Sequence, residues 1–156
     1  FRGTEFIGTN FKKSKFRRAI FENAVFEGVN LGDVDFRDAE FKNVIFVGCD
    51  LSSAKSLEYK ESEVRVFDEI PELDISKELE EAVLKAMGNE KVKSSRVLDT
   101  KDGGINPISI MILLEKFSEK NLISGLNILA DRLDRDFCTL SYITKCIETY
   151  GKEGIL

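Results

Sequence analysis

The fold of this chain is decided by residues 1–55, which read FRGTEFIGTNFKKSKFRRAIFENAVFEGVNLGDVDFRDAEFKNVIFVGCDLSSAK. A large apolar residue recurs there at every fifth position without a gap. The series consists of Phe1, Phe6, Phe11, Phe16, Phe21, Phe26, Leu31, Phe36, Phe41, Phe46 and Leu51. A helix would scatter a five-residue period around its circumference, and a flat strand would send it to alternate faces. The spacing therefore predicts a chain that turns a corner every five residues, with one large side chain pointing inward on each side.

The residues around each large side chain support a cornered chain. Two positions before it, the sequence carries small or β-branched residues such as Thr4, Ala24 and Val44, which would point inward beside it. Two positions after it, turn-forming residues are predicted to make the corners. These residues are Gly3, Gly8, Asn23, Gly28, Asp33, Asp38, Asn43, Gly48 and Ser53, with Lys13 and Arg18 as exceptions.

On these residues, the segment 1–55 resembles the pentapeptide-repeat family, whose motif is a small residue, a polar residue, a central Leu or Phe and two variable residues. The resemblance covers about a third of the chain. It implies a β solenoid of a particular kind, a right-handed quadrilateral β-helix with about twenty residues per coil and just under three coils. Outer charges of opposite sign should then face each other between coils, as in Arg2/Glu22 and Lys15/Asp35/Lys55.

The rest of the chain is predicted to be helical, which makes the fold class a β solenoid plus α. Residues 56–73 are interpreted as a charged connector, with Tyr59, Val64, Val66 and Phe67 as candidate anchors on the last coil. Residues 74–156 are predicted to form a helical domain, a compact bundle of about four helices. This bundle is expected to cap the end of the solenoid, because open solenoid ends need a cover.

Apolar periodicity and capping residues place the helices of this domain. An amphipathic helix is predicted over Ser76–Met87, and the polar stretch 88–105 is predicted to be a mobile loop. Asn106 and Pro107 predict the start of a buried helix. Apolar residues at steps of three and four predict two more helices, one with Leu122, Leu126, Leu129 and Leu133, the other with Leu140, Ile143, Ile147 and Tyr150.

Composition argues against catalysis. The chain has no histidine, the most frequent general base and metal ligand, and no arrangement of acid, base and nucleophile is evident. We therefore predict a protein that is not an enzyme, with no catalytic, cofactor-binding or metal-binding residue and no cofactor. The acidic run Asp131, Asp134 and Asp136 is interpreted as a solvated helix end.

Charge and hydropathy limit the partners and the compartment. The net charge of −5 and the nearly neutral repeats disfavour nucleic acid, and the longest apolar run is too short to cross a membrane. The sparse cysteines Cys49, Cys138 and Cys146 favour a reducing compartment, so a cytoplasmic location is predicted. Because Phe1 is already in phase with the repeat, the chain is expected to be part of a larger protein.

Two groups of surface residues are candidates for contact with a protein partner. The basic cluster Lys12, Lys13, Lys15, Arg17 and Arg18 could attract an acidic partner, but acidic residues of the next coil should partly neutralise it, so it is interpreted mainly as a solvated surface. Apolar residues also occupy repeat positions that should face outward, where they predict a small exposed strip. The strip consists of Val25, Ile45, Val47, Ile20 and Ile7. Either the helical tail folds back on it or a partner protein docks there.

These features favour a non-catalytic protein–protein interaction or scaffold module. A second hypothesis follows from the resemblance, because some pentapeptide-repeat proteins resemble duplex DNA and bind topoisomerases. Those proteins are long, dimeric and strongly acidic, whereas this repeat segment has fewer than three coils and a charge of about +1. The sequence does not indicate the oligomeric state.

Overall fold

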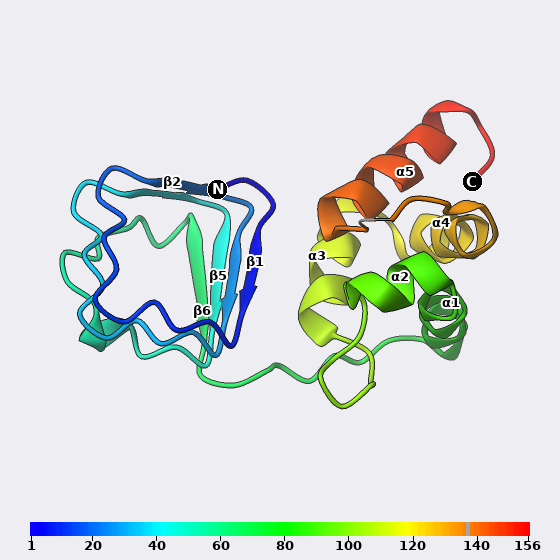
Figure 1. Ribbon diagram of the computed structural model, residues 1–156. Coiled ribbons are helices and arrows are strands. Elements are labelled where there is room, and N and C mark those ends of the chain that lie inside the picture. Colours follow the sequence, from blue (N-terminus) through cyan, green and yellow to red (C-terminus); the bar gives the residue numbers. More distant parts are fainter. Residues whose placement is uncertain (137) are drawn as a thin grey trace. The chain divides into compact units, whose positions relative to one another are not determined.

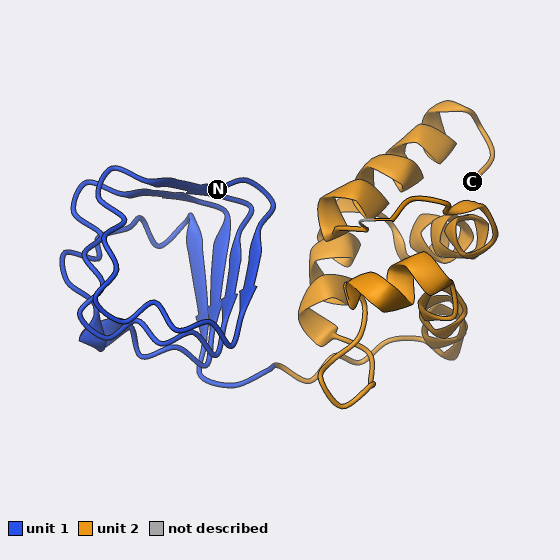
Figure 2. Cartoon of the chain, viewed as in Figure 1, with its two compact units in different colours: residues 1–70 blue, residues 71–156 orange. Residues whose placement is uncertain are grey.

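The computed structural model describes residues 1–136 and 138–156 (Figure 1). It divides into two units, Phe1–Ile70 and Pro71–Leu156, coloured blue and orange in Figure 2. The first unit is a β-solenoid of about three turns, and the second is helical. The predicted fold class is therefore confirmed.

The strands of the solenoid form two sheets, and the strands within each sheet are parallel. One sheet has the order β1 (Glu5–Ile7), β3 (Val25–Glu27), β5 (Val44–Val47) and β6 (Val64–Phe67), and the other pairs β2 (Ile20–Glu22) with β4 (Glu40–Lys42). Each residue pairs with the residue twenty positions further along, as Phe6 does with Phe26. The expected twenty-residue coil is thus confirmed, and we call residues 1–20, 21–40 and 41–60 coils 1, 2 and 3.

Phenylalanine rings fill the interior of the solenoid. The ring centroid of Phe21 lies 5.0 Å from that of Phe1 and 5.4 Å from that of Phe41, with ring planes within 10° of parallel. Phe26 and Phe46 also stack, at 4.7 Å with their ring planes 22° apart. Within one coil, rings from neighbouring sides meet edge to face, as Phe21 and Phe26 do at 5.3 Å. Such pairs contribute about 0.5 to 1.5 kcal/mol beyond the area they bury, so the rings stabilise each coil and the stack of coils together.

The corners of the coils are built from left-handed backbone. Positive φ angles between 50° and 64° occur two positions after every central residue from Phe1 to Phe46, and therefore also at Lys13 and Arg18. A residue with a Cβ atom is generally strained by about 1 to 2 kcal/mol in this conformation, which Gly avoids and Asn and Asp tolerate best. This explains why Gly, Asn and Asp dominate the corner positions. The corner predicted at Ser53 is different, because Leu51–Ser53 forms a short 3-10 helix capped by Asp50.

The solenoid extends beyond residue 55. The sequence predicts a connector over residues 56–73, but β6 lies within that segment and pairs with β5. Val64 is 6% exposed and packs in the solenoid core at the position equivalent to Val44. The five-residue spacing has ended here, but alternating apolar and charged residues are sufficient to add a strand. The solenoid unit accordingly reaches Ile70.

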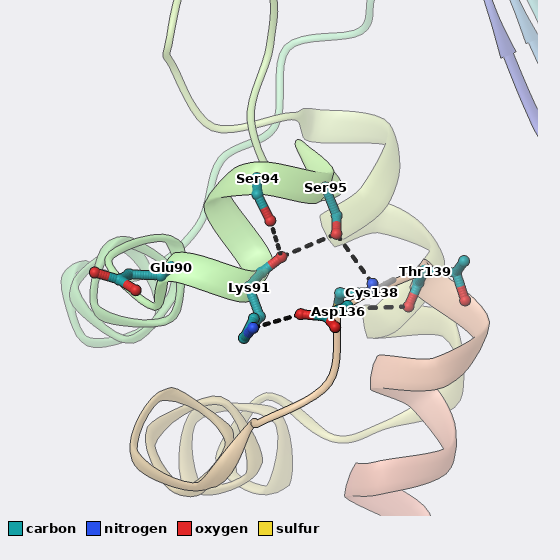
Figure 3. Close-up of a pocket in the computed structure, with 7 residues that line it drawn as sticks. All are labelled: Glu90, Lys91, Ser94, Ser95, Asp136, Cys138 and Thr139. Carbon is teal, nitrogen blue, oxygen red and sulfur yellow. Dashed lines mark hydrogen bonds and ion pairs between the residues drawn. The ribbon is translucent and has the colours of Figure 1, made fainter.

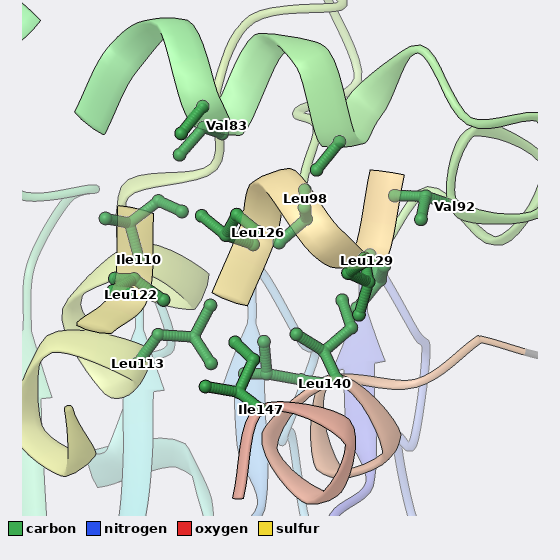
Figure 4. Packing of buried hydrophobic residues seen from close by; sticks show 14 of the residues in the cluster. Val83, Val92, Leu98, Ile110, Leu113, Leu122, Leu126, Leu129, Leu140 and Ile147 are labelled. Carbon is green, nitrogen blue, oxygen red and sulfur yellow. The ribbon is translucent and has the colours of Figure 1, made fainter. Parts of the chain in front are cut away.

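The described part of the helical unit contains five helices, one more than predicted. They are α1 (Lys77–Met87), α2 (Glu90–Ser95), α3 (Pro107–Lys116), α4 (Glu119–Arg132) and α5 (Leu140–Lys152). The side chain of Ser76 accepts a hydrogen bond from the backbone N–H of Leu79, and Asn106 caps α3 in the same manner. Helix α4 packs against both α1 and α5, and the buried side chains between them include Leu126 and Ile147 (Figure 4).

The prediction of a mobile loop over residues 88–105 is wrong. Helix α2 lies within this segment, and Val92, Val97 and Leu98 are all buried in the core of the helical unit. The backbone N–H of Asn106 donates to the carbonyl oxygen of Leu98, which closes the segment onto the start of α3. Val92, Val97 and Leu98 are spaced neither at the three- and four-residue steps of a helix nor at the two-residue step of a strand. Because the residues around them are polar, the sequence pattern did not predict that they are buried.

Candidate functional site

The outer face of the four-stranded sheet carries most of the predicted contact strip. Because side chains alternate along a strand, the inward phenylalanines leave their neighbours pointing outward. The strand register places Glu5, Val25, Ile45 and Arg65 in one outward row. The second outward row consists of Ile7, Glu27, Val47 and Phe67. Val25 and Ile45 are therefore neighbours, as their spacing predicts, and we call this surface the apolar wall.

The centre of the apolar wall is shielded from water, although the sequence predicts an exposed strip. Val25, Ile45 and Val47 are 6%, 2% and 1% exposed, and none of them belongs to the cluster that fills the solenoid. Ile7 at the edge of the wall is 55% exposed. Ile20 is 45% exposed and lies in β2, in the other sheet, so it does not join the strip. The structure thus brings together four of the five predicted residues.

Two acidic residues flank the apolar wall. Glu5 lies beside Val25, and Glu27 lies between Ile7 and Val47 in the strand register. Burial, together with the negative charge of Glu27, raises the pKa of Glu5 to about 7. Burial also raises the pKa of Glu27. Ionised carboxylates are therefore costly on this wall, because apolar surroundings disfavour the charged form.

We expect the stability of the protein to fall as the pH rises from about 4.5 to about 7. In that range folded Glu5 retains a proton that the unfolded chain has released, so deprotonation favours unfolding. Urea denaturation of the full chain at several pH values tests this. Glu5→Gln should flatten the pH dependence and be the more stable form at pH 8. A wild-type midpoint that rises over this range, or an equal slope for both proteins, would contradict the assignment.

A polar pocket lies in the helical unit, between α2 and the segment before α5 (Figure 3). Its volume is about 610 Å³, and its lining consists of Glu90, Lys91, Ser94, Ser95, Asp136, Cys138 and Thr139. The hydroxyl of Ser95 donates to the carbonyl oxygen of Lys91 at 2.9 Å and accepts from the backbone N–H of Cys138 at 3.0 Å. Lys91 forms an ion pair with Asp136. The hydrogen bond from the backbone N–H of Cys138 to Ser95 and the ion pair of Lys91 with Asp136 hold α2 to the chain before α5.

Cys49 and Asp131 take part in structural contacts. In the part of the chain that the structure describes, no group of three or more His, Cys, Asp or Glu residues could hold a metal ion. The thiol of Cys49 donates to the carbonyl oxygen of Phe26, and burial raises its pKa, which makes the thiolate scarce. Asp131, from the acidic run, forms an ion pair with Lys85 at 3.2 Å. No described helix is both long and apolar enough to span a membrane.

Comparison with known protein families agrees with the geometry of the first unit. A family model described as pentapeptide repeats, in nine copies, matches residues 1–55. Residues 1–55 are pentapeptide repeats. The match covers the pentapeptide repeats of all three coils but stops before β6, where the five-residue spacing has ended. Comparison with curated proteins gives no match.

Proposed function

We propose that the protein is a non-catalytic interaction module whose pentapeptide-repeat solenoid presents the apolar wall to another protein. The observation that carries this proposal is the row formed by Val25 and Ile45, with Val47 beside it. These side chains are apolar although they point away from the ring-filled interior. An outward apolar row on a regular sheet is suited to contact with protein.

The construction of the solenoid supports a binding role. Parallel pairing between coils and the stacked rings fix the outward rows at defined positions on the sheet. A rigid wall loses little conformational entropy when a partner binds, which favours affinity for a given contact area. The half-buried thiols of Cys49 and Cys146 favour action in a reducing compartment such as the cytoplasm.

The alternative role, as a DNA mimic that binds a topoisomerase, has less support. A DNA mimic needs negative charge along its whole length, because the DNA backbone is uniformly negative. Coil 1 instead carries six Lys and Arg against one Glu. Inhibition of DNA supercoiling by the purified protein would revive this alternative.

The proposed function is tested by comparing proteins retained from a native lysate by three forms of the full chain. The wild-type protein and Ile20→Glu should retain the same specific partner, since Ile20 lies outside the wall. Val25→Glu/Ile45→Glu should lose at least about nine tenths of it, because two charges in an apolar contact cost several kcal/mol. Binding of the purified partner should show the same difference.

Folding of the three forms is checked by thermal denaturation. Val25 and Ile45 are 6% and 2% exposed, so the double variant should lose some stability, and retention is compared at a temperature at which all three forms are folded. Equal retention by all three forms would contradict a contact role for the wall. Loss of folding in the double variant alone would show that the wall serves the chain's own stability and would also count against the proposal.

A further inference from the structure

The two sheets of the solenoid differ in the side chains that they present outward. In the larger sheet, five of the eight outward positions are apolar, namely Ile7, Val25, Ile45, Val47 and Phe67. In the smaller sheet, which pairs β2 with β4, only one of the four outward positions is apolar. These positions are Ile20, Glu22, Glu40 and Lys42. The apolar wall is therefore a property of one sheet and not of the repeat in general.

Strand β5 has the composition of a strand that is covered on both faces. Its residues Val44–Val47 are apolar without interruption, whereas a strand with one face in water alternates apolar and polar residues. Val44 and Phe46 belong to the interior cluster, and Ile45 and Val47 point outward. Parallel strands that read in this way are normally covered by α-helices. The composition of β5 thus favours a helix as the element that packs on its outer face.

The pairing of the strands excludes strand addition at the centre of the wall. Strand β3 pairs with β1 and β5, and β5 pairs with β3 and β6, so neither has a free edge. An added strand needs such an edge, and an occupant of the centre must therefore make its contacts through side chains. Neighbouring strands lie about 4.8 Å apart, so β3, β5 and β6 together span about 10 Å, close to the diameter of one helix.

The wall also carries negative charge. Glu27 lies between Ile7 and Val47 in its outward row, and Glu5 lies beside Val25 in the other row. Among the residues that the structure describes, neither carboxylate forms an ion pair. Covering an ionised carboxylate without a partner charge is strongly unfavourable. A helix that covers the wall therefore needs a Lys or Arg beside its apolar stripe.

We propose that the partner of the apolar wall contributes one amphipathic α-helix, with a Lys or Arg beside its apolar stripe that pairs with Glu27. The apolar stripe packs on Val25, Ile45 and Val47, and the cation lies over the second outward row. The inference rests on the proposed function and deepens it, because it names the structural element and the charge of the partner.

Three fluorescent peptides of about 14 residues, or about four helical turns, serve as probes of the full chain. The first has Leu at steps of three and four, with Lys on both sides of this stripe. The second has the same composition with Leu and Lys in alternation, and the third keeps the helical spacing with Gln in place of Lys. Fluorescence anisotropy is measured at pH 8, above the pKa of Glu5. We expect the first peptide to bind at least about fivefold more tightly than either of the others.

Variants of the protein test the charge and the apolar contact separately. Glu27→Gln should bind the first peptide about fivefold more weakly and the third equally well. Glu40→Gln is the matched control, because it removes the same charge from β4 in the other sheet, and it should bind like the wild type. Val25→Ser/Ile45→Ser removes apolar contact without adding charge and should lose most of the binding of all three peptides. Circular dichroism establishes that each variant is folded at the temperature of the assay.

The outcomes separate this inference from the proposed function. Equal or tighter binding of the alternating peptide, or equal effects of Glu27→Gln and Glu40→Gln, would overturn the inference alone. Peptide binding that the serine substitutions leave unchanged would contradict a contact role for the wall itself. No binding of any peptide by the wild type would also overturn the inference. Self-association of the wild type that the serine variant loses would assign the wall to a second copy of the chain and overturn it as well.

Discussion

Phe26→Ala should destabilise the solenoid by about 3 to 5 kcal/mol, a large part of the 5 to 15 kcal/mol typical of a whole domain. The ring of Phe26 is fully buried and lies 4.8 Å from Phe6, 4.7 Å from Phe46 and 5.3 Å from Phe21. Its removal leaves a cavity between rings that are held by the sheets and cannot collapse. Hydrogen exchange of the amides in β3 and β5 measures the effect separately from the helical unit.

Phe1→Ala is the matched control, because it removes the same kind of ring from a position where one other ring stacks on it. Phe1 is 51% exposed and stacks on one side only, on Phe21 at 5.0 Å. We expect a cost of about 1 kcal/mol, since little buried area is lost. Similar losses for the two variants would mean that the rings are not stacked between coils as described.

Gly125→Ala should destabilise the helical unit by about 1 to 3 kcal/mol, although the change from Gly to Ala normally stabilises a helix by about 1 kcal/mol. A Cβ at Gly125 would lie 2.8 Å from both Cγ1 and Cγ2 of Ile147, closer than atoms in contact can approach. Ile147 is fully buried, so α4 and α5 must move apart. Amide exchange in these two helices should accelerate, while exchange in the solenoid strands should not change.

Gly151→Ala tests whether the cost comes from the contact between the helices. Gly151 also lies in α5, but its added Cβ would be 3.4 Å from the nearest side-chain atom, Cδ1 of Leu156. This variant should be neutral or more stable by up to about 1 kcal/mol. Ile147→Ala should cost less stability in the Gly125→Ala background than in the wild type, because it removes the atoms that the new Cβ meets. Destabilisation by both glycine variants, or an equal cost of Ile147→Ala in the two backgrounds, would point to a different cause.

The period of the repeat made the solenoid predictable from sequence. A single position, the central Phe or Leu, defined the coil, and the residue two positions later defined the corner. Lys13 and Arg18 also adopt the left-handed corner conformation, although residues of their type disfavour it. The pairing of the coils outweighs the local strain. Caps were predictable for a similar reason, since Ser76 and Asn106 act through hydrogen bonds within a few residues.

Features that depend on contacts distant in sequence were missed. Strand β6 lacks the repeat motif and is held by its pairing with β5, and Val92, Val97 and Leu98 are core residues without a period. For the candidate site, the spacing of twenty identified Val25 and Ile45 as neighbours. It did not separate Ile20, which lies in the other sheet, nor did it predict that the centre of the wall is buried.

The central claim, that the apolar wall binds another protein, is tested most directly by photo-crosslinking from the wall itself. A photoreactive amino acid is placed at position 45, or at position 20 as a control outside the wall, and each protein is irradiated in a native lysate. We expect position 45 to yield one discrete, heavier adduct that position 20 does not give. Crosslinks from position 45 that remain within the mass of the single chain, or adducts identical from both positions, would contradict the claim.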